Sequence, residues 1–303
     1  MTELDVVTGA FGYTGRYITE RLLDAGRSVR TLTGHPGRPN PFGDRVQVAN
    51  LDLGDPDALR ASLRGASTLY NTYWVRFPYG GMTYDVAVRN TQTLIEAAHD
   101  AGVARVVHIS ITNPSQDSPF PYFRGKARTE SLVRGSGLPH AIVRPTVVFG
   151  KQDILVNNLA YILRRVPVFG VPGSGSYRVR PVAVEDVAEI CVRVAGEATD
   201  RVIDAVGPET LTFEQMVRTI ARTIGRRVAF VHVPPAIALA SASAIGWVLG
   251  DVLVTKEELD GLIAGLATTD GPATGSRRLT DWLRANADTV GVRYASEVAR
   301  HFS

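Results

Sequence analysis

Short apolar runs alternate with amphipathic stretches over the first two thirds of the chain. The stretches in between place apolar residues three and four positions apart and predict helices, whereas the runs themselves predict strands. The predicted strands are 4–8, 28–33, 46–49, 67–72, 104–110, 140–144 and 201–206, and the predicted helices are 14–25, 56–64, 83–101, 120–134 and 185–197. This alternation predicts an α/β fold with a doubly wound parallel sheet, whose ligands bind at the carboxyl ends of the strands.

After residue 150 apolar runs and amphipathic stretches no longer alternate regularly, which predicts a second, smaller lobe. Residues 151–180 are rich in Gly, Pro and Val, and beyond 208 helices are predicted at 212–225, 236–249, 255–266 and 276–286. The nucleotide-binding core is therefore expected to span 1–150, with 182–207 returning to it. The smaller, mainly helical lobe is expected to comprise 151–181 and 208–303 and to hold the substrate.

One segment of this lobe, 236–254, is apolar over 19 residues and contains a single charged residue, Asp251. A membrane-spanning helix needs about 20 strongly apolar residues, and this segment is rich in Ala and Ser. We expect no membrane span. The segment is interpreted as a helix packed within the lobe, with a surface that touches a membrane or a partner as the alternative.

Composition narrows the functional classes. The net charge is +3 and the basic residues are scattered, which favours a solvated surface over a nucleic-acid footprint. A single cysteine, Cys191, excludes an intramolecular disulfide and a cysteine metal site, and its spacing predicts a core position on a helix. The six histidines show no metal-binding spacing, so no metal is predicted. The first residues lack a signal-peptide pattern, and a cytoplasmic protein is the default expectation.

A glycine-rich turn joins the first predicted strand to the first predicted helix. In "VVTGAFGYTGRY" the glycines Gly9, Gly12 and Gly15 would let the backbone approach a pyrophosphate at the helix N-terminus. An ordinary glycine-rich turn is the alternative. The residues expected to contact a dinucleotide here are Gly9, Phe11, Gly12, Tyr13, Thr14 and Gly15.

The segment after the second strand, "TLTGHPGRP", lacks the acid that usually binds the ribose of NAD. His35 and Arg38 are candidates for binding a 2′-phosphate, with Arg16 as a further one, so NADP is favoured and NAD is the alternative. The alternative is that His35 and Arg38 are ordinary loop residues. Asp52 and Leu53 follow the third strand and are candidates for contacting adenine.

Tyr122 and Lys126 lie four residues apart on a predicted helix and so share one face. A nearby ammonium favours the phenolate form of a tyrosine, which makes the pair suited to proton transfer at a carbonyl or alcohol. The chain has only three lysines. A compact ammonium fits this task better than a planar guanidinium does. A lysine extending to solvent is the alternative.

The segments "TGAFGYTGR", "LDL", "VVHIS", "YFRGK" and "RPTVVFG" together resemble the short-chain dehydrogenase/reductase superfamily over about 4–207. The similarity is greatest to its extended and atypical branches, which include nucleotide-sugar epimerases, nitrogen-metabolite-repression-type redox sensors and the Rossmann accessory subunit of respiratory complex I. The resemblance implies a Rossmann fold and either a monomer or a homodimer formed through the helices after strands 4 and 5.

The resemblance also implies residue roles. Tyr122 would be the acid/base, Lys126 its partner and a ribose ligand, and Ser110 or Thr112 the ligand of the substrate hydroxyl. Further cofactor contacts are implied for Thr72, Pro145, Thr146 and Val147. Two departures matter: Gly34 stands where NADP-binding members often have Arg, and the spacing from Ser110 to Tyr122 matches no branch.

The loop after the fourth strand, "YNTYWVRFPYGGMTY", gathers aromatic residues at the expected substrate side. Tyr73, Trp74, Phe77 and Tyr79 are interpreted as an apolar pocket, with an aromatic plug against the smaller lobe as the alternative. Epimerases of the superfamily bind their substrate diphosphate with an arginine in a similar segment, a role that Arg178 or Arg180 would take here.

Three functions follow as hypotheses. The leading one is an NADP-dependent oxidoreductase that transfers hydride between nicotinamide and a small carbonyl or alcohol. The second is a dinucleotide-binding redox sensor or assembly protein without turnover. The third is a nucleotide-sugar epimerase or dehydratase with tightly bound NAD.

Overall fold

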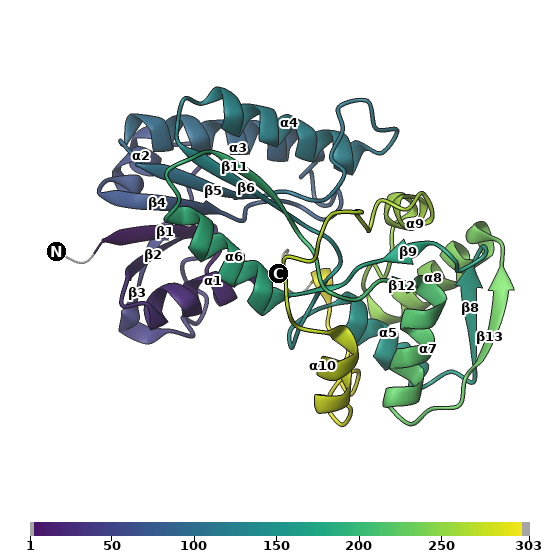
Figure 1. The fold of residues 1–303 in the computed structure, drawn as a ribbon. Helices are drawn as coiled ribbons and strands as arrows, with labels where there is room; N and C mark the ends of the chain where they lie inside the picture. Colours follow the sequence, from purple (N-terminus) through teal and green to yellow (C-terminus); the bar gives the residue numbers. More distant parts are fainter. Residues whose placement is uncertain (1–2, 299–303) are drawn as a thin grey trace. The chain divides into compact units, whose positions relative to one another are not determined.

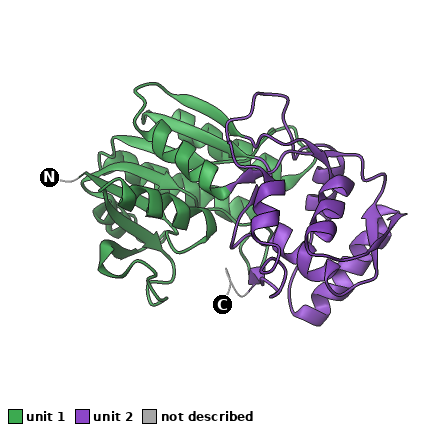
Figure 2. Cartoon of the chain, turned by 60° about the horizontal axis from the view of Figure 1, so that its bottom comes forward, with its two compact units in different colours: residues 1–145, 184–205 green, residues 146–183, 206–303 purple. Residues whose placement is uncertain are grey.

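The computed structural model describes residues 3–298 and divides into two compact units (Figures 1 and 2). Unit 1 comprises residues 1–145 and 184–205, and unit 2 comprises 146–183 and 206–303. The sequence pattern placed these divisions at 150, 182 and 207. The chain thus leaves the first unit after its sixth strand and later returns to add one helix and one strand.

Unit 1 contains a seven-stranded sheet in the order β11-β6-β5-β4-β1-β2-β3, in which every pair is parallel. This confirms the predicted α/β fold. Each predicted strand lies within a residue or so of an observed one. The strands are β1 (Leu4–Thr8), β2 (Ser28–Thr33), β3 (Val46–Asn50), β4 (Ala66–Asn71), β5 (Arg105–Ile109), β6 (His140–Pro145) and β11 (Arg201–Ala205).

Helices cover both faces of this sheet (Figure 1). Helices α1 and α6 pack together, and α3 packs against both α2 and α4. Local signals set their ends: Asp55 and Thr83 cap α2 and α3 through the backbone N–H groups three residues on, and Gly26 and Gly102 adopt positive φ just beyond α1 and α3. The helices are α1 (Tyr13–Asp24), α2 (Pro56–Leu63), α3 (Tyr84–Asp100), α4 (Pro121–Gly135) and α6 (Val184–Ala195), and a short 3-10 turn, η1 (Gly43–Arg45), precedes β3.

The strand order reverses direction at β1, which lies between β2 and β4. In open parallel sheets the crevice outside the carboxyl ends of strands at such a reversal is where ligands bind. Here β1 ends at Thr8 and β4 at Asn71, and the glycine-rich turn follows β1 directly. The topology therefore places that turn at the ligand-binding edge of the sheet.

Unit 2 is built around a separate apolar core, formed mainly by α5 and α7 with side chains from its short strands. Helix α7 begins with a capping box in which Thr212 and Gln215 bind each other's backbone N–H groups. The helices are α5 (Leu155–Leu163), α7 (Phe213–Thr223), α8 (Pro235–Leu249), α9 (Lys256–Ile263) and α10 (Leu279–Ala285), and the strands are β7 (Val148–Phe149), β8 (Val168–Pro172), β9 (Arg178–Val179), β10 (Val182–Ala183), β12 (Leu211–Thr212) and β13 (Ala229–Val233).

Unit 2 departs from the sequence prediction in α5 and in all of its strands, β7, β8, β9, β10, β12 and β13. None of these elements was predicted. The start of α5 is fixed by Asp153, whose carboxylate accepts the backbone N–H groups of Leu155 and Val156. Strands β8 and β13 lie about 60 residues apart in sequence and form their own two-stranded parallel sheet, a pairing that local periodicity does not reveal.

Within residues 3–298, no helix has both the length and the apolar character needed to cross a lipid bilayer. The apolar segment at 236–254 forms α8 and the turn after it.

Candidate functional site

The glycine-rich turn after β1 is held in a shape that side chains would disrupt. Gly9 has a φ of +67°, and its carbonyl oxygen accepts the Gly12 N–H at 2.8 Å. A Cβ on Gly15 would lie 2.3 Å from the Gly9 carbonyl oxygen, and one on Gly12 would lie 3.2 Å from it. The spacing of the three glycines is therefore required by this backbone as well as by any ligand.

The N-terminus of α1 has the character of an anion site. Its N-cap is Gly12, no side chain caps it, and no acidic residue lies in its first turn. The N–H groups of a helix N-terminus and the helix dipole favour a phosphate at such a position. Phe11, Tyr13 and Thr14 are half-buried on this turn. The residues present fit the pyrophosphate of a dinucleotide.

The residues predicted for the adenosine end lie after β2 and β3. His35 is exposed and Arg38 is half-buried, and both belong to one tight turn, in which the Arg38 N–H donates to the His35 carbonyl. Asp52 is exposed and accepts the Gly54 N–H at 3.0 Å, whereas Leu53 packs partly against the core of unit 1. Arg16, the third cation considered, forms an ion pair with Glu20 on α1.

Lys126 on α4 is only 3% exposed. Its ammonium donates to the Ile109 carbonyl oxygen at 2.9 Å and lies 4.7 Å from the centre of the Trp74 ring. Burial lowers the pKa of Lys126 to about 7, and Glu130 opposes this shift. A lysine at this position therefore changes its charge close to neutral pH, which an arginine does not do.

Tyr122 lies in an aromatic cluster formed with Trp74, Tyr84 and Phe123. Trp74 stacks on Tyr84 with ring centres 6.0 Å apart, and Tyr122 meets both of these rings edge-on. Gly125 makes room for the indole, because a Cβ there would lie 2.8 Å from Trp74. Trp74 thus contacts both members of the Tyr122/Lys126 pair, which the sequence placed on one helix face.

Ser110 follows β5 at the same edge of the sheet. Its side chain is 4% exposed, and its hydroxyl has no hydrogen-bond partner within residues 3–298. A buried polar group without a partner costs about 1–3 kcal/mol. The indole Nε1 of Trp74 is also buried without a partner. Thr112, two residues on, is buried, and its N–H donates to the Pro145 carbonyl. The predicted role of Ser110 as a ligand of the substrate oxygen stays a prediction.

A chain of hydrogen bonds that the sequence did not reveal lies below these residues. The Thr72 N–H donates to Thr8 Oγ1 at 2.8 Å, and that oxygen lies 3.4 Å from Asn71 Oδ1. The Asn71 Oδ1 also accepts the Tyr73 N–H at 3.0 Å. This fixes the amide, so that its Nδ2 donates to Nδ1 of His108 at 3.1 Å.

From His108 the chain continues to α4. Its Nε2 carries the proton and donates to Thr129 Oγ1 at 3.1 Å, and the Thr129 hydroxyl donates to the Lys126 carbonyl at 2.8 Å. Burial and the nearby Lys126 lower the pKa of His108 to about 3, so the ring is neutral. The ends of β1, β4 and β5 are thereby tied to the helix turn that bears Lys126. The only sequence signals were Asn71 at a strand end and Thr129 three residues after Lys126.

The burial of Lys126 predicts a specific pH dependence of stability. The unfolded chain holds the Lys126 proton up to its ordinary pKa of 10.5, whereas the folded chain releases it near 7. The unfolded state therefore binds more protons between these values, and stability rises with pH there by up to about 1.4 kcal/mol per pH unit. We expect Lys126→Met to be more stable than wild type at pH 6.5, with the difference shrinking by pH 9.5.

Urea unfolding at both pH values measures this, with Lys256→Met as the control because Lys256 is an exposed residue paired with Asp260 on α9. The prediction is contradicted if the free energies of unfolding of wild type and Lys126→Met change equally with pH between 6.5 and 9.5.

Two further predicted cofactor contacts, Thr146 and Val147, belong to unit 2, whereas Pro145 ends β6 in unit 1. The Thr146 hydroxyl donates to the Arg180 carbonyl, and the Val147 carbonyl accepts the Val182 N–H. These hydrogen bonds of Thr146 and Val147 are thus made within unit 2.

The two candidate diphosphate ligands of unit 2 differ. Arg180 is buried, and its guanidinium donates to the carbonyls of Thr269, Gly271 and Gly207, so it ties backbone segments together. Arg178 is exposed and pairs with Asp270 at 3.2 Å. Of these two residues, only Arg178 has its guanidinium at the surface.

The aromatic loop after β4 is partly structural. Phe77 is buried, and Tyr79 pairs through its backbone with Met82. The Tyr73 hydroxyl accepts the Asn90 amide at 2.7 Å, and burial raises its pKa. Trp74 contacts both Tyr122 and Lys126, and Tyr84 at the end of the segment contacts Tyr122.

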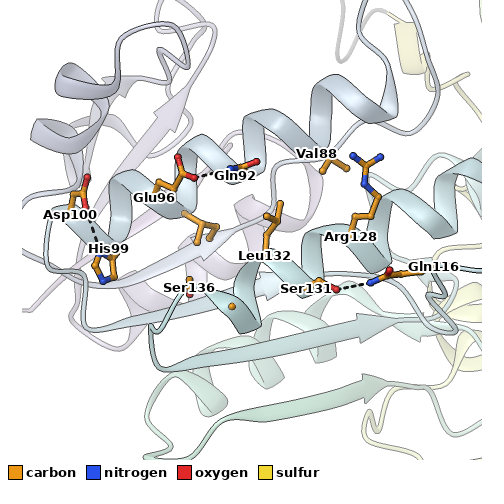
Figure 3. Close-up of a pocket in the computed structure, with 12 residues that line it drawn as sticks. Val88, Gln92, Glu96, His99, Asp100, Gln116, Arg128, Ser131, Leu132 and Ser136 are labelled. Carbon is orange, nitrogen blue, oxygen red and sulfur yellow. Dashed lines mark hydrogen bonds and ion pairs between the residues drawn. The ribbon is translucent and has the colours of Figure 1, made fainter.

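A pocket of about 750 Å³ lies elsewhere, on the outer surface of α3 and α4 (Figure 3). Polar and apolar side chains line it, among them Gln92 bonded to Glu96, Ser131 bonded to Gln116, and the apolar Val88, Ile95 and Leu132. None of the residues predicted for cofactor or substrate lines it. Its walls are the two helices that the family resemblance implies for a dimer, a prediction that stays open.

Among residues 3–298, no three His, Cys, Asp or Glu side chains come together as a metal site. Cys191 is buried, and burial raises its pKa well above the ordinary range of a thiol.

A seven-stranded parallel sheet with a glycine-rich turn at its reversal point places the chain in the class of Rossmann-like α/β proteins. Residues 1–258 match the model of the NmrA-like family, and the chain belongs to that family. The resemblance to the atypical branch of the short-chain dehydrogenase/reductase superfamily is thereby confirmed.

The proteins to which this chain is similar in sequence are named for different functions. The chain is 26% identical over 269 residues to the 40 kDa subunit of mitochondrial NADH-ubiquinone oxidoreductase from Neurospora crassa, covering 84% of this chain and 69% of the subunit. It is 28% identical over 235 residues to (4-alkanoyl-5-oxo-2,5-dihydrofuran-3-yl)methyl phosphate reductase from Streptomyces griseus, covering 74% of this chain and 75% of the reductase.

Among solved structures, the fold is similar to that of triphenylmethane reductase from Citrobacter sp. complexed with NADP(H). The TM-score is 0.75 at 17% identity, over 94% of this chain and 99% of that one. This likeness establishes the fold.

Proposed function

We propose that the chain is an NADP-dependent oxidoreductase that transfers hydride between nicotinamide and a small carbonyl or alcohol. Membership of the NmrA-like family supports dinucleotide binding, and the names of two similar proteins, one of them complexed with NADP(H), support reduction. The observation that carries the proposal is the buried hydroxyl of Ser110, left without a partner at the sheet edge where the Tyr122/Lys126 helix begins.

The residues would divide the reaction among them. NADPH, when bound, supplies the hydride. Ser110 donates a hydrogen bond to the substrate oxygen and orients it. Tyr122 gives its proton to that oxygen as it gains charge, and the ammonium of Lys126 stabilises the phenolate that remains. Since the pKa of Lys126 lies near 7, this assistance is strongest on the acidic side of neutrality.

The cofactor preference gives a direct prediction. A nucleotide-free sample should bind NADPH more tightly than NADH, followed by nicotinamide fluorescence, because a cation near a 2′-phosphate adds charge-assisted hydrogen bonds. Replacing Arg38 and His35 together with Ala should weaken NADPH binding by about 10-fold or more and leave NADH binding unchanged. An NADPH affinity that survives the double replacement would show that the 2′-phosphate binds elsewhere. Binding of neither nucleotide would remove the enzymatic proposal.

A dinucleotide-binding protein without turnover is the second candidate, and one observation favours it. The Lys126 ammonium is engaged by the Ile109 carbonyl and covered by Trp74, so in this conformation it is withdrawn from solvent. The similarity to a respiratory-complex subunit also fits this role. The second candidate is favoured if the protein binds NADPH but does not oxidise it when carbonyl compounds, quinones or aldehydes are added.

The epimerase hypothesis has less support. It relied on Arg178 or Arg180 as a diphosphate ligand, and the Arg180 guanidinium is occupied by three backbone carbonyls. Protein purified with NAD already bound would restore it.

A further inference from the structure

Helix α8 exposes an apolar face. From Val233 to Gly250 the chain has no charged residue, and the only buried residue of the helix is Gly246. Trp247 is 86% exposed and Val248 is 74% exposed. With Ile237, Ala240 and Ala244 they recur three or four residues apart, so the exposed residues form one stripe along the helix. A contiguous exposed apolar stripe of this kind, rather than a single exposed residue, marks an interaction surface.

The neighbouring two-stranded sheet adds apolar residues. Helix α8 packs against β8, which pairs with β13. Val168 and Val231 are about half exposed. Val168 is paired with Ala229, two residues before Val231, so both valines lie on one face of the ribbon. The rings of Phe169 and Phe230 contact each other on the opposite face, toward the core of unit 2.

Arginines are concentrated at the start of β13. Arg222, Arg226 and Arg227 are exposed, and within residues 3–298 none of them has an acidic partner. Together with Arg218 they line a pocket of about 500 Å³ whose wall includes Pro167, Ala229 and Phe230. Arg218 is paired with Glu214 and lies over the Phe230 ring. The arginines therefore adjoin the start of β13, the strand that bears the exposed Val231.

We propose that this surface, formed by α8, the β8/β13 ribbon and Arg222, Arg226 and Arg227, binds the interface of an anionic lipid bilayer. Arginines without acidic partners complement lipid phosphates, and an indole is favoured at the boundary between headgroups and acyl chains. The exposed stripe is mostly Ala and Ser between Ile237 and Trp247, which offers a protein partner few large side chains to interlock with, whereas a fluid bilayer needs no such complementarity. The contact is peripheral, since α8 is too short to span.

This proposal is independent of the proposed enzymatic function. Its test uses the whole chain with vesicles of phosphatidylcholine alone, or with about 30% phosphatidylglycerol, and measures co-sedimentation. We expect binding to be at least about 10-fold tighter on the anionic vesicles. Arg226→Glu with Arg227→Glu should weaken it by about 25-fold or more, because each basic residue near an anionic surface contributes about 5-fold. The pair Arg45→Glu with Arg64→Glu, exposed residues of unit 1, makes the same charge change and should have less than about 3-fold effect.

The apolar contribution is tested separately. Trp247→Ser should weaken vesicle binding by about 10-fold or more. The gentler Trp247→Phe tests whether Trp247 itself meets the lipid. In the wild type, anionic vesicles should shift tryptophan fluorescence to shorter wavelength, and brominated lipids should quench it. Both effects should disappear in Trp247→Phe, although Trp74 and Trp282 remain. Circular dichroism confirms that each variant is folded.

Three outcomes would overturn the proposal. One is that the protein binds neutral and anionic vesicles equally well, or binds neither. Another is a solution dimer, seen by light scattering, that Trp247→Ser converts to monomer, because the face would then belong to a second copy. The third is inorganic phosphate competing for the arginines while Trp247→Ser changes nothing, which would leave a soluble-anion site only.

Discussion

Tyr122→Phe is expected to lower kcat by about 10²- to 10⁴-fold, the range typical of losing a positioned acid or base. The substitution removes only the phenolic hydroxyl and keeps the ring, whose edge-on contacts with Trp74 and Tyr84 hold it in place. The loss should therefore appear in kcat, while the Kd for NADPH stays within about 3-fold. The measurement is single-turnover oxidation of NADPH with a carbonyl substrate found by screening.

The matched control is Tyr161→Phe, which removes a hydroxyl from a tyrosine packed against Tyr294 in unit 2. It should turn over as wild type does. If Tyr122→Phe keeps full activity, the acid lies elsewhere and Tyr122 is a packing residue of the cluster. If both NADPH binding and turnover fall together, the variant has disturbed the fold, and Lys126→Arg then tests the pair: it keeps a positive charge but not the compact ammonium.

Gly15→Ala should weaken NADPH binding by about 100-fold or more. The added methyl would lie 2.3 Å from the Gly9 carbonyl oxygen, a contact that real Cβ atoms do not make. The turn must open, and the N–H groups at the start of α1 then lose their common direction toward a phosphate. Nicotinamide fluorescence titration measures this loss without requiring a known substrate.

Gly135→Ala is the control because it makes the same change at the end of α4, where a Cβ meets nothing within 4 Å. It should leave NADPH binding unaltered. A folded Gly15→Ala protein that binds NADPH as wild type does would mean that the turn is structural and that the nucleotide, if bound, is held by other residues.

The fold of unit 1 was largely predictable because its signals are local. Each predicted run of four to seven residues became a strand, and cap residues such as Asp55 and Gly102 marked helix ends that the structure confirms. The strands β8 and β13 were missed because neither is stable without the other, and their pairing joins segments far apart in sequence. Helix α8 was predicted, but the expectation that it packs within the lobe is wrong, because only Gly246 of the helix is buried. That expectation followed from its apolar composition, which normally means burial; the alternative of an exposed contact surface fits its exposure better.

The candidate site was predictable in its parts and not in its environment. The spacing of Tyr122 and Lys126 placed them on one face of a helix, yet nothing local showed that Trp74 covers the lysine or that burial lowers its pKa to about 7. The chain from Thr8 through His108 to Thr129 joins three strands and a helix, so it exists only after the sheet has formed.

The late return of the chain to unit 1 has a consequence for synthesis on the ribosome. Strand β6 ends at Pro145, and its neighbour β11 does not begin until Arg201. At about 5–20 residues per second, several seconds pass before β11 can be made. During that interval the edge of β6 presents unpaired backbone groups to any other strand nearby. The nascent protein is therefore most open to misassembly after its nucleotide cradle has been made and before its sheet is complete.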